Sequence, residues 1–201
     1  MTTVYTKETW AELKNDDCIM KFDGEYSFLS NFYECEIEVW GHKFRSVEAA
    51  FQALKCPERM DEFENLTAYE AKRLGRKVKL RDDWELRKIS IMKMLLEQKF
   101  SHPELTQKLV ATGNLYLIEG NYWKDDFWGV CEVGKGQNHL GKLLMEVRSV
   151  YLRRIHLKDA LMDFFDIKGV CLWYKLTHRF EEMTEEDIDN IVEHVFNYQK
   201  D

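Results

Sequence analysis

Helix start signals recur along this chain and constrain its fold more than any other feature of the sequence. Ser46 is followed by a segment in which Val47, Phe51 and Leu54 recur at i, i+4 and i+7, the spacing of a buried helical stripe. Later segments also combine a capping residue with helical spacing: 67–75, 81–100, 101–113 and 184–199. Residues 138–154 return to helical spacing. The sequence therefore predicts a mainly helical chain.

Local signals also set the expected limits of these helices. Thr67 and Glu70 form a capping box, and Gly75 is the expected stop of the same helix. The helix within 81–100 begins with an aspartate cap, Asp82 or Asp83. Its expected inner face comprises Ile89, Met92 and Leu96, and the helix within 101–113 is expected to open at Ser101 and Glu104 and to close at Gly113.

Strand signals are few and short. Residues 35–46, CEIEVWGHKFRS, predict a hairpin whose two-residue type II′ turn is Gly41-His42. Residues 114–130 predict short extended segments rich in aromatic side chains. The chain has neither a βαβ rhythm nor a glycine-rich phosphate loop, which disfavours a Rossmann domain. The predicted fold class is mainly α with a few short β-strands (α+β).

The sequence changes character after about Arg154. Residues 157–165, 172–180 and 184–199 each predict an amphipathic helix, the last with Thr184 as its cap. We therefore expect a main domain at 1–154 and a helical C-terminal extension at 155–201. The extension either packs on the main domain or forms a dimer surface.

Composition excludes several classes of protein. A formal net charge of -7 argues against general attraction to nucleic-acid phosphates, although one local site for a nucleic acid remains possible. The five cysteines are scattered without a CxxC pair, and the histidines lack HExxH spacing, so no metal or redox cofactor is expected. No signal peptide or membrane span is evident, which predicts a cytoplasmic protein.

One polar helix face is the first candidate for a reaction site. Glu48, Gln52 and Lys55 are spaced i, i+4 and i+7 and share one side of the helix that follows Ser46. They form either a solvated face or a carboxylate and an amine in one cleft. In a cleft, a desolvated lysine can lose its proton and attack a carbonyl carbon while the carboxylate moves protons.

Two further segments have both a structural and a functional interpretation, and a third has a structural one. Residues 121–129, NYWKDDFWG, form either a turn anchored by tryptophans or an aromatic wall with acids for a sugar or base. Residues 22–34, FDGEYSFLSNFYE, form a loop with local hydrogen bonds or part of a binding site. Residues 81–85, RDDWE, need no explanation beyond a helix cap.

The order of these motifs resembles that of the NADAR family, also called YbiA-like proteins. The resemblance rests on FDGEYSFLSNFY, FRSVEAAFQALK, GRKVKLRDDWELRKISIM, LIEGNYWKDDFWGV and GKGQNHLGKLLMEVR, and covers about residues 22–148. It implies a compact, multihelical YbiA-like domain with N-glycosidase activity. The family helix often reads SVEHAYQ, whereas this chain has Ala49 and Phe51, which lack a histidine and a phenol hydroxyl.

The resemblance implies two substrate classes. The leading hypothesis is the removal of ADP-ribose from the amino group of guanine in nucleic acid, as an antitoxin against an ADP-ribosyltransferase toxin or as a damage-reversal enzyme. The alternative is hydrolysis of phosphorylated ribosylamino intermediates of riboflavin biosynthesis. A third hypothesis is a non-catalytic module that binds ADP-ribose or a nucleotide. The basic run Lys72, Arg73, Arg76, Lys77, Lys79 and Arg81 either supplies a rim for nucleic acid or is a solvated face.

The same resemblance implies which residues form the site. Glu48 assists proton transfer, Lys55 forms a Schiff base with the anomeric carbon, and Asp125 orients ribose hydroxyls or water. Trp84 and Trp128 wall the pocket, and phosphate or ribose groups are held by Ser30, Asn31 and Asn138. The remaining expected substrate-binding residues are Phe32, Gln52, Arg81, Asn121 and Gly129.

Overall fold

The computed structural model describes residues 17–131 and 136–168, with side chains described up to residue 156. The chain divides into two compact units, Met1–Arg148 and Ser149–Asp201. The expected boundary near residue 154 remains a prediction, and the expected helices at 172–180 and 184–199 lie outside the described residues. Within the described ranges, no helix combines the length and the apolar character needed to cross a membrane.

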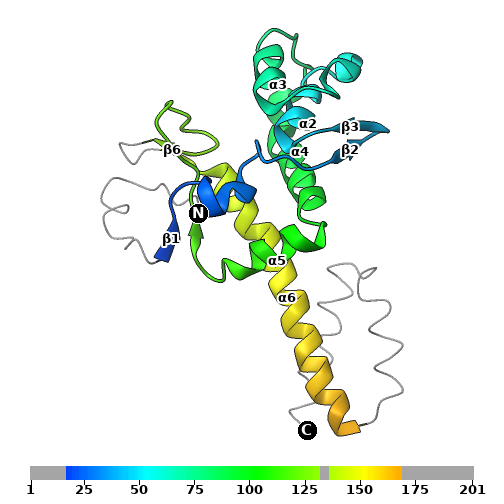
Figure 1. Ribbon diagram of the computed structural model, residues 1–201, viewed down its shortest axis with the longest axis vertical. Helices are drawn as coiled ribbons and strands as arrows, with labels where there is room; N and C mark the ends of the chain where they lie inside the picture. Colours follow the sequence, from blue (N-terminus) through cyan, green and yellow to red (C-terminus); the bar gives the residue numbers. More distant parts are fainter. Residues whose placement is uncertain (1–16, 132–135, 169–201) are drawn as a thin grey trace. The chain divides into compact units, whose positions relative to one another are not determined.

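Helices dominate the described elements, and the strands are two or three residues long (Figure 1). The helices are the 3₁₀ helices η2 (Gly24–Leu29) and η3 (Pro57–Phe63), and α2 (Val47–Ala53), α3 (Ala68–Gly75), α4 (Trp84–Lys99), α5 (Pro103–Ala111) and α6 (His139–Lys168). The strands are β1 (Cys18–Ile19), β2 (Ile37–Val39), β3 (His42–Phe44), β4 (Tyr116–Leu117), β5 (Gly120–Asn121) and β6 (Val130–Cys131). The strands pair in parallel as β1–β4 and β5–β6 and antiparallel as β2–β3. The predicted α+β fold class is confirmed.

Helix α2 lies at the centre of the first unit and packs against α3, α4 and η3. The predicted cap is confirmed, because the Ser46 hydroxyl accepts a hydrogen bond of 3.1 Å from the Ala49 N–H. Val47, Phe51 and Leu54 are buried as expected. All residues of α2, however, are buried. The interpretation of its polar side as a solvated face is therefore wrong.

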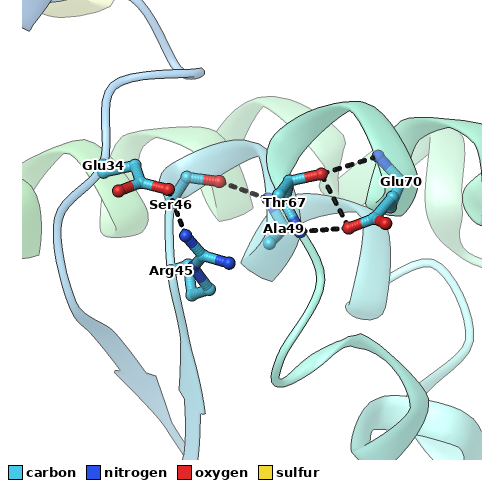
Figure 2. A network of polar contacts seen from close by, with 6 residues as sticks. All are labelled: Glu34, Arg45, Ser46, Ala49, Thr67 and Glu70. Atoms are coloured by element: carbon cyan, nitrogen blue, oxygen red, sulfur yellow. Dashed lines mark hydrogen bonds and ion pairs between the residues drawn. The ribbon is translucent and has the colours of Figure 1, made fainter.

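Helix α3 begins at the predicted capping box. The Thr67 hydroxyl accepts a bond from the Glu70 N–H, and the Glu70 carboxylate accepts a bond of 2.9 Å from the Thr67 N–H. Figure 2 shows this box beside the Ser46 cap and the ion pair between Glu34 and Arg45. The helix ends at Gly75 as expected, but no left-handed cap ends it, since the next residue, Arg76, has a φ of -75°.

The predicted details of α4 are partly wrong. Asp83 precedes the helix, but its side chain makes no capping bond and pairs instead with Arg81 and Arg87. These pairings, led by the hydrogen bond from Arg81, lower the pKa of Asp83 to about 2. Met92 and Leu96 are buried, whereas Ile89 is 38% exposed. The buried stripe continues to Lys99, whose side chain packs toward the segment that follows η2.

Helix α5 also starts differently from the prediction. His102 occupies the N-cap position and Pro103 the first turn. The Ser101 hydroxyl instead donates a 2.7 Å hydrogen bond to the Gln98 carbonyl at the end of α4. A serine between two helices can hydrogen-bond to the backbone of either one, and Ser101 bonds to the preceding helix.

Helix α6 continues through the position at which the sequence changes character. It runs without interruption from His139 to Lys168. The segment 157–165 is therefore part of the same helix as 139–154, which corrects the expectation of a separate helix. Amphipathic spacing on each side of residue 154 fits one long helix as well as two short ones.

The predicted hairpin forms, but its turn lies one residue earlier than expected. Val39 pairs with His42, which leaves Trp40 and Gly41 as the two loop residues. Their φ angles are 52° and 84°. Positive φ at both positions is typical of a type I′ turn, so the predicted Gly41-His42 type II′ turn is wrong. The position of the glycine alone does not distinguish these two registers.

Replacing Trp40 with asparagine is expected to stabilise the protein by about 1 kcal/mol, because asparagine tolerates a left-handed backbone that strains a bulky residue. Trp40 is 71% exposed, so little packing is lost. Chemical denaturation measures the difference. Trp40→Ala removes the same ring without the left-handed preference and serves as the control. An equal gain in both variants would contradict a turn-specific effect.

Candidate active site

A single large cavity of about 1400 Å³ gathers most of the predicted site residues. Its lining comes from the segment around η2, from α2 and α3, and from the segment 119–131, all within the first unit. The predicted residues that line it are Ser30, Asn31, Phe32, Glu48, Gln52, Lys55, Asn121, Asp125 and Trp128. Residues far apart in the sequence thus share one site.

The α2 side of the cavity carries a buried carboxylate and a nearby amine. Glu48 is 6% exposed, and its Oε1 accepts a 2.9 Å hydrogen bond from the Gln52 Nε2. Lys55 lies beyond the helix, which ends at Ala53, so it does not continue the helical face that its spacing suggested. It still lines the same cavity as Glu48.

Burial brings both of these groups nearer to neutrality. It raises the pKa of Glu48, an effect that Lys72, the Gln52 hydrogen bond and Lys55 partly offset. Burial also lowers the pKa of Lys55, and the neighbouring charges of Lys72 and Arg76 lower it further, against the opposing effect of Glu48. A lysine with a lowered pKa has a larger fraction of the nucleophilic free amine.

Aromatic rings surround the Lys55 amine. Its Nζ lies 5.6 Å from the centre of the Trp84 ring and 5.8 Å from that of Phe51. The Phe51 ring in turn contacts Trp84 at 4.9 Å and Trp128 at 5.4 Å between centroids. Phe51 lines the cavity, whereas Ala49 is fully buried outside its lining. With phenylalanine at position 51, the cavity lining has no phenol hydroxyl at this point.

Asn121 holds the backbone that presents Asp125. Its Nδ2 donates a 2.8 Å hydrogen bond to the Asp125 carbonyl, and its Oδ1 accepts one of 2.9 Å from the Asp125 N–H. Asp125 Oδ1 then accepts bonds from the N–H groups of Phe127 and Trp128, at 3.2 and 2.9 Å. These bonds fix the carboxylate at the cavity wall. Asn121 supports the site through the backbone.

The segment Ser30–Phe32 joins the cavity to the buried end of α4. The Ser30 carbonyl accepts a 2.7 Å bond from the Nζ of Lys99, whose pKa burial lowers to about 8. Asn31 donates to the Met92 sulfur at 3.4 Å, and its backbone carbonyl accepts the Glu48 N–H at 2.9 Å. Within the described chain, the buried Asn31 Oδ1 has no hydrogen-bond partner. This oxygen can therefore accept a further hydrogen bond.

Four predicted site residues lie outside the cavity lining. Arg81 pairs with Asp83, and Trp84 is buried behind Phe51. A side chain at Gly129 would come within 2.2 Å of the Glu119 carbonyl, so a glycine allows that close approach. Asn138 is the fourth residue outside the lining.

Asn138 connects the start of α6 to the strand segment. Its Oδ1 accepts a 3.1 Å bond from the Glu119 N–H, and its Nδ2 donates one of 2.9 Å to the Leu117 carbonyl. The side chain is 1% exposed. Both of its polar ends thus bind backbone, so Asn138 positions the segment that contains Glu119.

Sequence reasoning missed Glu119 as a site residue. It lines the cavity, and burial, reinforced by the charge of Asp125, raises the pKa of its carboxyl to about 7. The available signal was an acidic residue directly after the apolar pair Leu117-Ile118. Three carboxylates, those of Glu48, Glu119 and Asp125, therefore line one cavity.

Further cations line the same cavity. Lys72, Arg73 and Arg76 come from the end of α3, and Arg45 comes from the segment before α2. Lys72 is also the largest of the opposing charges that keep the pKa of Glu48 from rising further. The other members of the predicted basic run, Lys77, Lys79 and Arg81, are not part of the lining.

Comparisons with known proteins match most of the chain to one family. A family model described as the NADAR domain matches residues 19–151. The chain is 36% identical over 141 residues to the N-glycosidase YbiA of Escherichia coli (strain K12), covering 66% of this chain and 88% of that protein. An N-glycosidase of Nostoc punctiforme is 36% identical over 132 residues, covering 61% of this chain and 84% of that protein.

Two further similarities are to a solved structure and to a relative that is named for riboflavin biosynthesis. The NMR structure of the E. coli protein YbiA superposes with a TM-score of 0.60 at 36% sequence identity, covering 68% of this chain and 86% of that one. A riboflavin biosynthesis protein of Vibrio vulnificus is 37% identical over 150 residues, which are 72% of this chain. The chain matches only 40% of the length of that Vibrio protein.

Replacing Glu119 with glutamine is expected to stabilise the fold by about 2 kcal/mol near pH 8 and by almost nothing near pH 4. Folding raises the pKa of this carboxyl from 4.5 to about 7. The native state therefore binds this proton more tightly, and stability falls as the pH rises through that interval. Glutamine carries no charge, so the variant does not lose stability as the pH rises.

Denaturation curves across this pH range measure the difference. Glu104→Gln, on the exposed side of α5, is the matched control. If the difference in unfolding free energy between Glu119→Gln and the wild type does not change with pH, the pKa of Glu119 is not raised.

Proposed function

This chain belongs to the NADAR family, and we propose that it removes ADP-ribose from the amino group of guanine in nucleic acid. The enzyme class follows from relatives that match most of their own length and are named N-glycosidases. The chain is accordingly a hydrolase that acts on N-glycosyl bonds. The identity of the substrate is the proposal.

The observation that carries the proposal is the size and polarity of the cavity. Its volume of about 1400 Å³ exceeds the roughly 300–1,000 Å³ of ordinary small-molecule sites. A guanine joined to a nucleotide diphosphate sugar needs more room than a single sugar phosphate. The lining also combines carboxylates and the Lys55 amine with further cations from the end of α3. This combination suits an N-linked sugar that carries phosphates.

We propose that the reaction begins with opening of the ribose ring. The bond between the ring oxygen and the anomeric carbon breaks as Glu48 assists the proton transfer, and an imine forms between that carbon and the guanine nitrogen. The free amine of Lys55 adds to the anomeric carbon. Guanine then leaves as its amine with a proton, and a Schiff base to Lys55 remains.

Water completes the cycle. It adds to the Schiff base, releases the aldehyde of ADP-ribose, and restores the Lys55 amine, so the net reaction consumes one water. Asp125 orients the ribose hydroxyls or this water. The rings of Phe51 and Trp84 shield the amine from bulk water, which favours the neutral lysine that the attack needs.

The cations at the end of α3 suit the phosphates. Arg73 and Arg76 are exposed, whereas Lys72 is half-buried and its Nζ lies 5.1 Å from the centre of the Phe32 ring. Guanidinium groups bind phosphate oxygens through paired hydrogen bonds. This local charge also offsets the net charge of -7 at the site. An unpaired or flipped guanine can therefore approach the cavity.

Within this proposal the biological role is reversal of guanine ADP-ribosylation. A cognate ADP-ribosyltransferase toxin is the functional counterpart that such an enzyme needs. The alternative substrate is a phosphorylated ribosylamino intermediate of riboflavin biosynthesis. The Vibrio relative and a chloroplastic protein of Zea mays, both named riboflavin biosynthesis proteins, favour this alternative. Both substrates have a ribose carbon bonded to an amino nitrogen.

Wild-type protein is expected to release ADP-ribose from guanine-ADP-ribosylated DNA, and Lys55→Ala to lower that rate by at least about a hundredfold. Mass spectrometry measures the release. Borohydride added during turnover reduces the Schiff base and leaves an adduct that peptide mapping places on Lys55. Lys43→Ala, in the exposed part of the β2–β3 hairpin, is the matched control.

The outcomes separate the candidate functions. Release from the riboflavin intermediate alone would favour the alternative substrate. Binding of ADP-ribose without any turnover would indicate a non-catalytic module. If Lys55→Ala stays active and the wild type gives no borohydride adduct, the Schiff-base mechanism is contradicted. Acid–base hydrolysis without a covalent intermediate would then account for the activity.

Replacing Arg73 with glutamine is expected to raise KM about fivefold with little change in kcat, because an exposed charge pair contributes about 1 kcal/mol. The difference from wild type is expected to shrink at high salt. Lys77→Gln removes a charge just beyond α3 and outside the cavity lining, so its KM is expected to stay unchanged. Equal effects of both substitutions would indicate a general electrostatic effect instead of a phosphate site.

A further inference from the structure

Gly75, the last residue of α3, is a glycine that its backbone does not require. Its φ lies outside the left-handed region that favours glycine. Glycine is also a poorer helix former than alanine. A reason other than local conformation must therefore account for a glycine at this position, and the packing of α3 against α2 supplies one.

The space beside Gly75 is occupied by the side chain of Gln52. A Cβ at position 75 would lie 1.9 Å from the Gln52 Oε1, 2.8 Å from its Cδ and 3.1 Å from its Cβ. The first two distances are far shorter than any stable contact. The amide of Gln52 can keep its present position only if residue 75 has no side chain.

That amide is in turn a partner of Glu48. Its Nε2 donates the 2.9 Å hydrogen bond to the Glu48 Oε1. Its Oε1 is buried and has no hydrogen-bond partner in the described part of the chain. Packing against Gly75, and not a bond to the oxygen, therefore holds the amide in the orientation that directs its N–H toward the carboxylate.

We propose that Gly75 is a positioning residue for Glu48, acting through Gln52. The proposal rests on the proposed function in so far as Glu48 moves the proton in the reaction. Gly75 leaves room for the amide, the amide donates to the carboxylate, and the carboxylate keeps its place in the cavity. A helix that lines the phosphate-binding part of the site thus also fixes the proton-transfer group.

The proposal makes Gly75→Ala informative, since the clash falls on the mobile end of a side chain. The Gln52 amide can rotate away, and the remaining contact of 3.1 Å with the Gln52 Cβ needs a shift of only a few tenths of an ångström, so the fold persists. The bond to Glu48 is lost in that rotation. Because this hydrogen bond is among the interactions that hold the pKa of Glu48 down, its loss raises that pKa further.

The test measures kcat, KM, the pH profile and the melting temperature of Gly75→Ala, Gln52→Ala and the double variant. We expect Gly75→Ala to lower kcat roughly tenfold, the effect of one hydrogen bond to a charged group. KM and the melting temperature are expected to stay near the wild-type values. The limb of the pH profile that reports Glu48 is expected to move to higher pH.

The double variant separates a path through Gln52 from a general packing effect. Gln52→Ala removes the side chain that the new methyl group would meet, so adding Gly75→Ala to it should change kcat no further. The double variant also has room for the methyl group if the single one folds poorly. A Gly75→Ala effect of full size in the Gln52→Ala background would overturn the proposal, as would wild-type kinetics for Gly75→Ala.

A second readout does not depend on the substrate. Carbon-13 NMR titration of the glutamate carboxyls, with Glu48→Gln to assign the signal, reports the Glu48 pKa in wild type and in Gly75→Ala. We expect a higher value in the variant, and equal values would overturn the proposal. If the wild type turns over neither candidate substrate, the proposed function fails while this titration still decides the role of Gly75.

Discussion

The burial of α2 on every side is the constraint on which the rest of the site depends. A seven-residue helix with no exposed face would normally be apolar throughout, yet this one contains Glu48 and Gln52. A buried carboxylate is costly unless hydrogen bonds and opposite charges compensate. Gln52 supplies the bond and Lys72 the largest compensating charge. The neighbours of α2 therefore compensate its buried polar residues as well as pack against it.

A second constraint is the close approach of backbone segments between β4 and the start of α6. A Cβ at Gly141 would lie 2.0 Å from the Leu117 carbonyl, and one at Gly129 would lie 2.2 Å from the Glu119 carbonyl. The Asn138 side chain adds hydrogen bonds to the backbone of Leu117 and of Glu119. Gly129, Asn138 and Gly141 do not line the cavity. Their contacts nevertheless fix the segment that brings Glu119 and Asp125 to it.

The site therefore combines two rigid supports with ionisable groups that burial shifts toward their neutral forms. Burial raises the pKa of Glu48 and of Glu119, and it lowers that of Lys55. Shifts of this kind cluster at functional sites and come at a cost in stability. Such a site depends on the surrounding dielectric more than on any single contact, because burial is the largest cause of each shift.

Local chemistry determined several elements in advance. The Ser46 cap, the Thr67–Glu70 capping box and the hairpin depend on residues within a few positions of one another, so the sequence alone predicted them. The motif order also identified Glu48, Lys55 and Asp125, which line one cavity, while their catalytic roles remain proposals. The turn at Trp40 was missed, because pairing register and not turn propensity decided it.

Tertiary structure alone decided which of these side chains are buried and what surrounds them. The spacing of Glu48 and Gln52 fits a solvated face as well as a reaction site, and only the packing of α3 and α4 excludes water from it. Glu119 and Gly75 lack a local pattern that assigns them to the site, since their importance comes from partners distant in the sequence. Helical spacing fixes which residues share a face, whereas desolvation and close approach depend on the elements that cover that face.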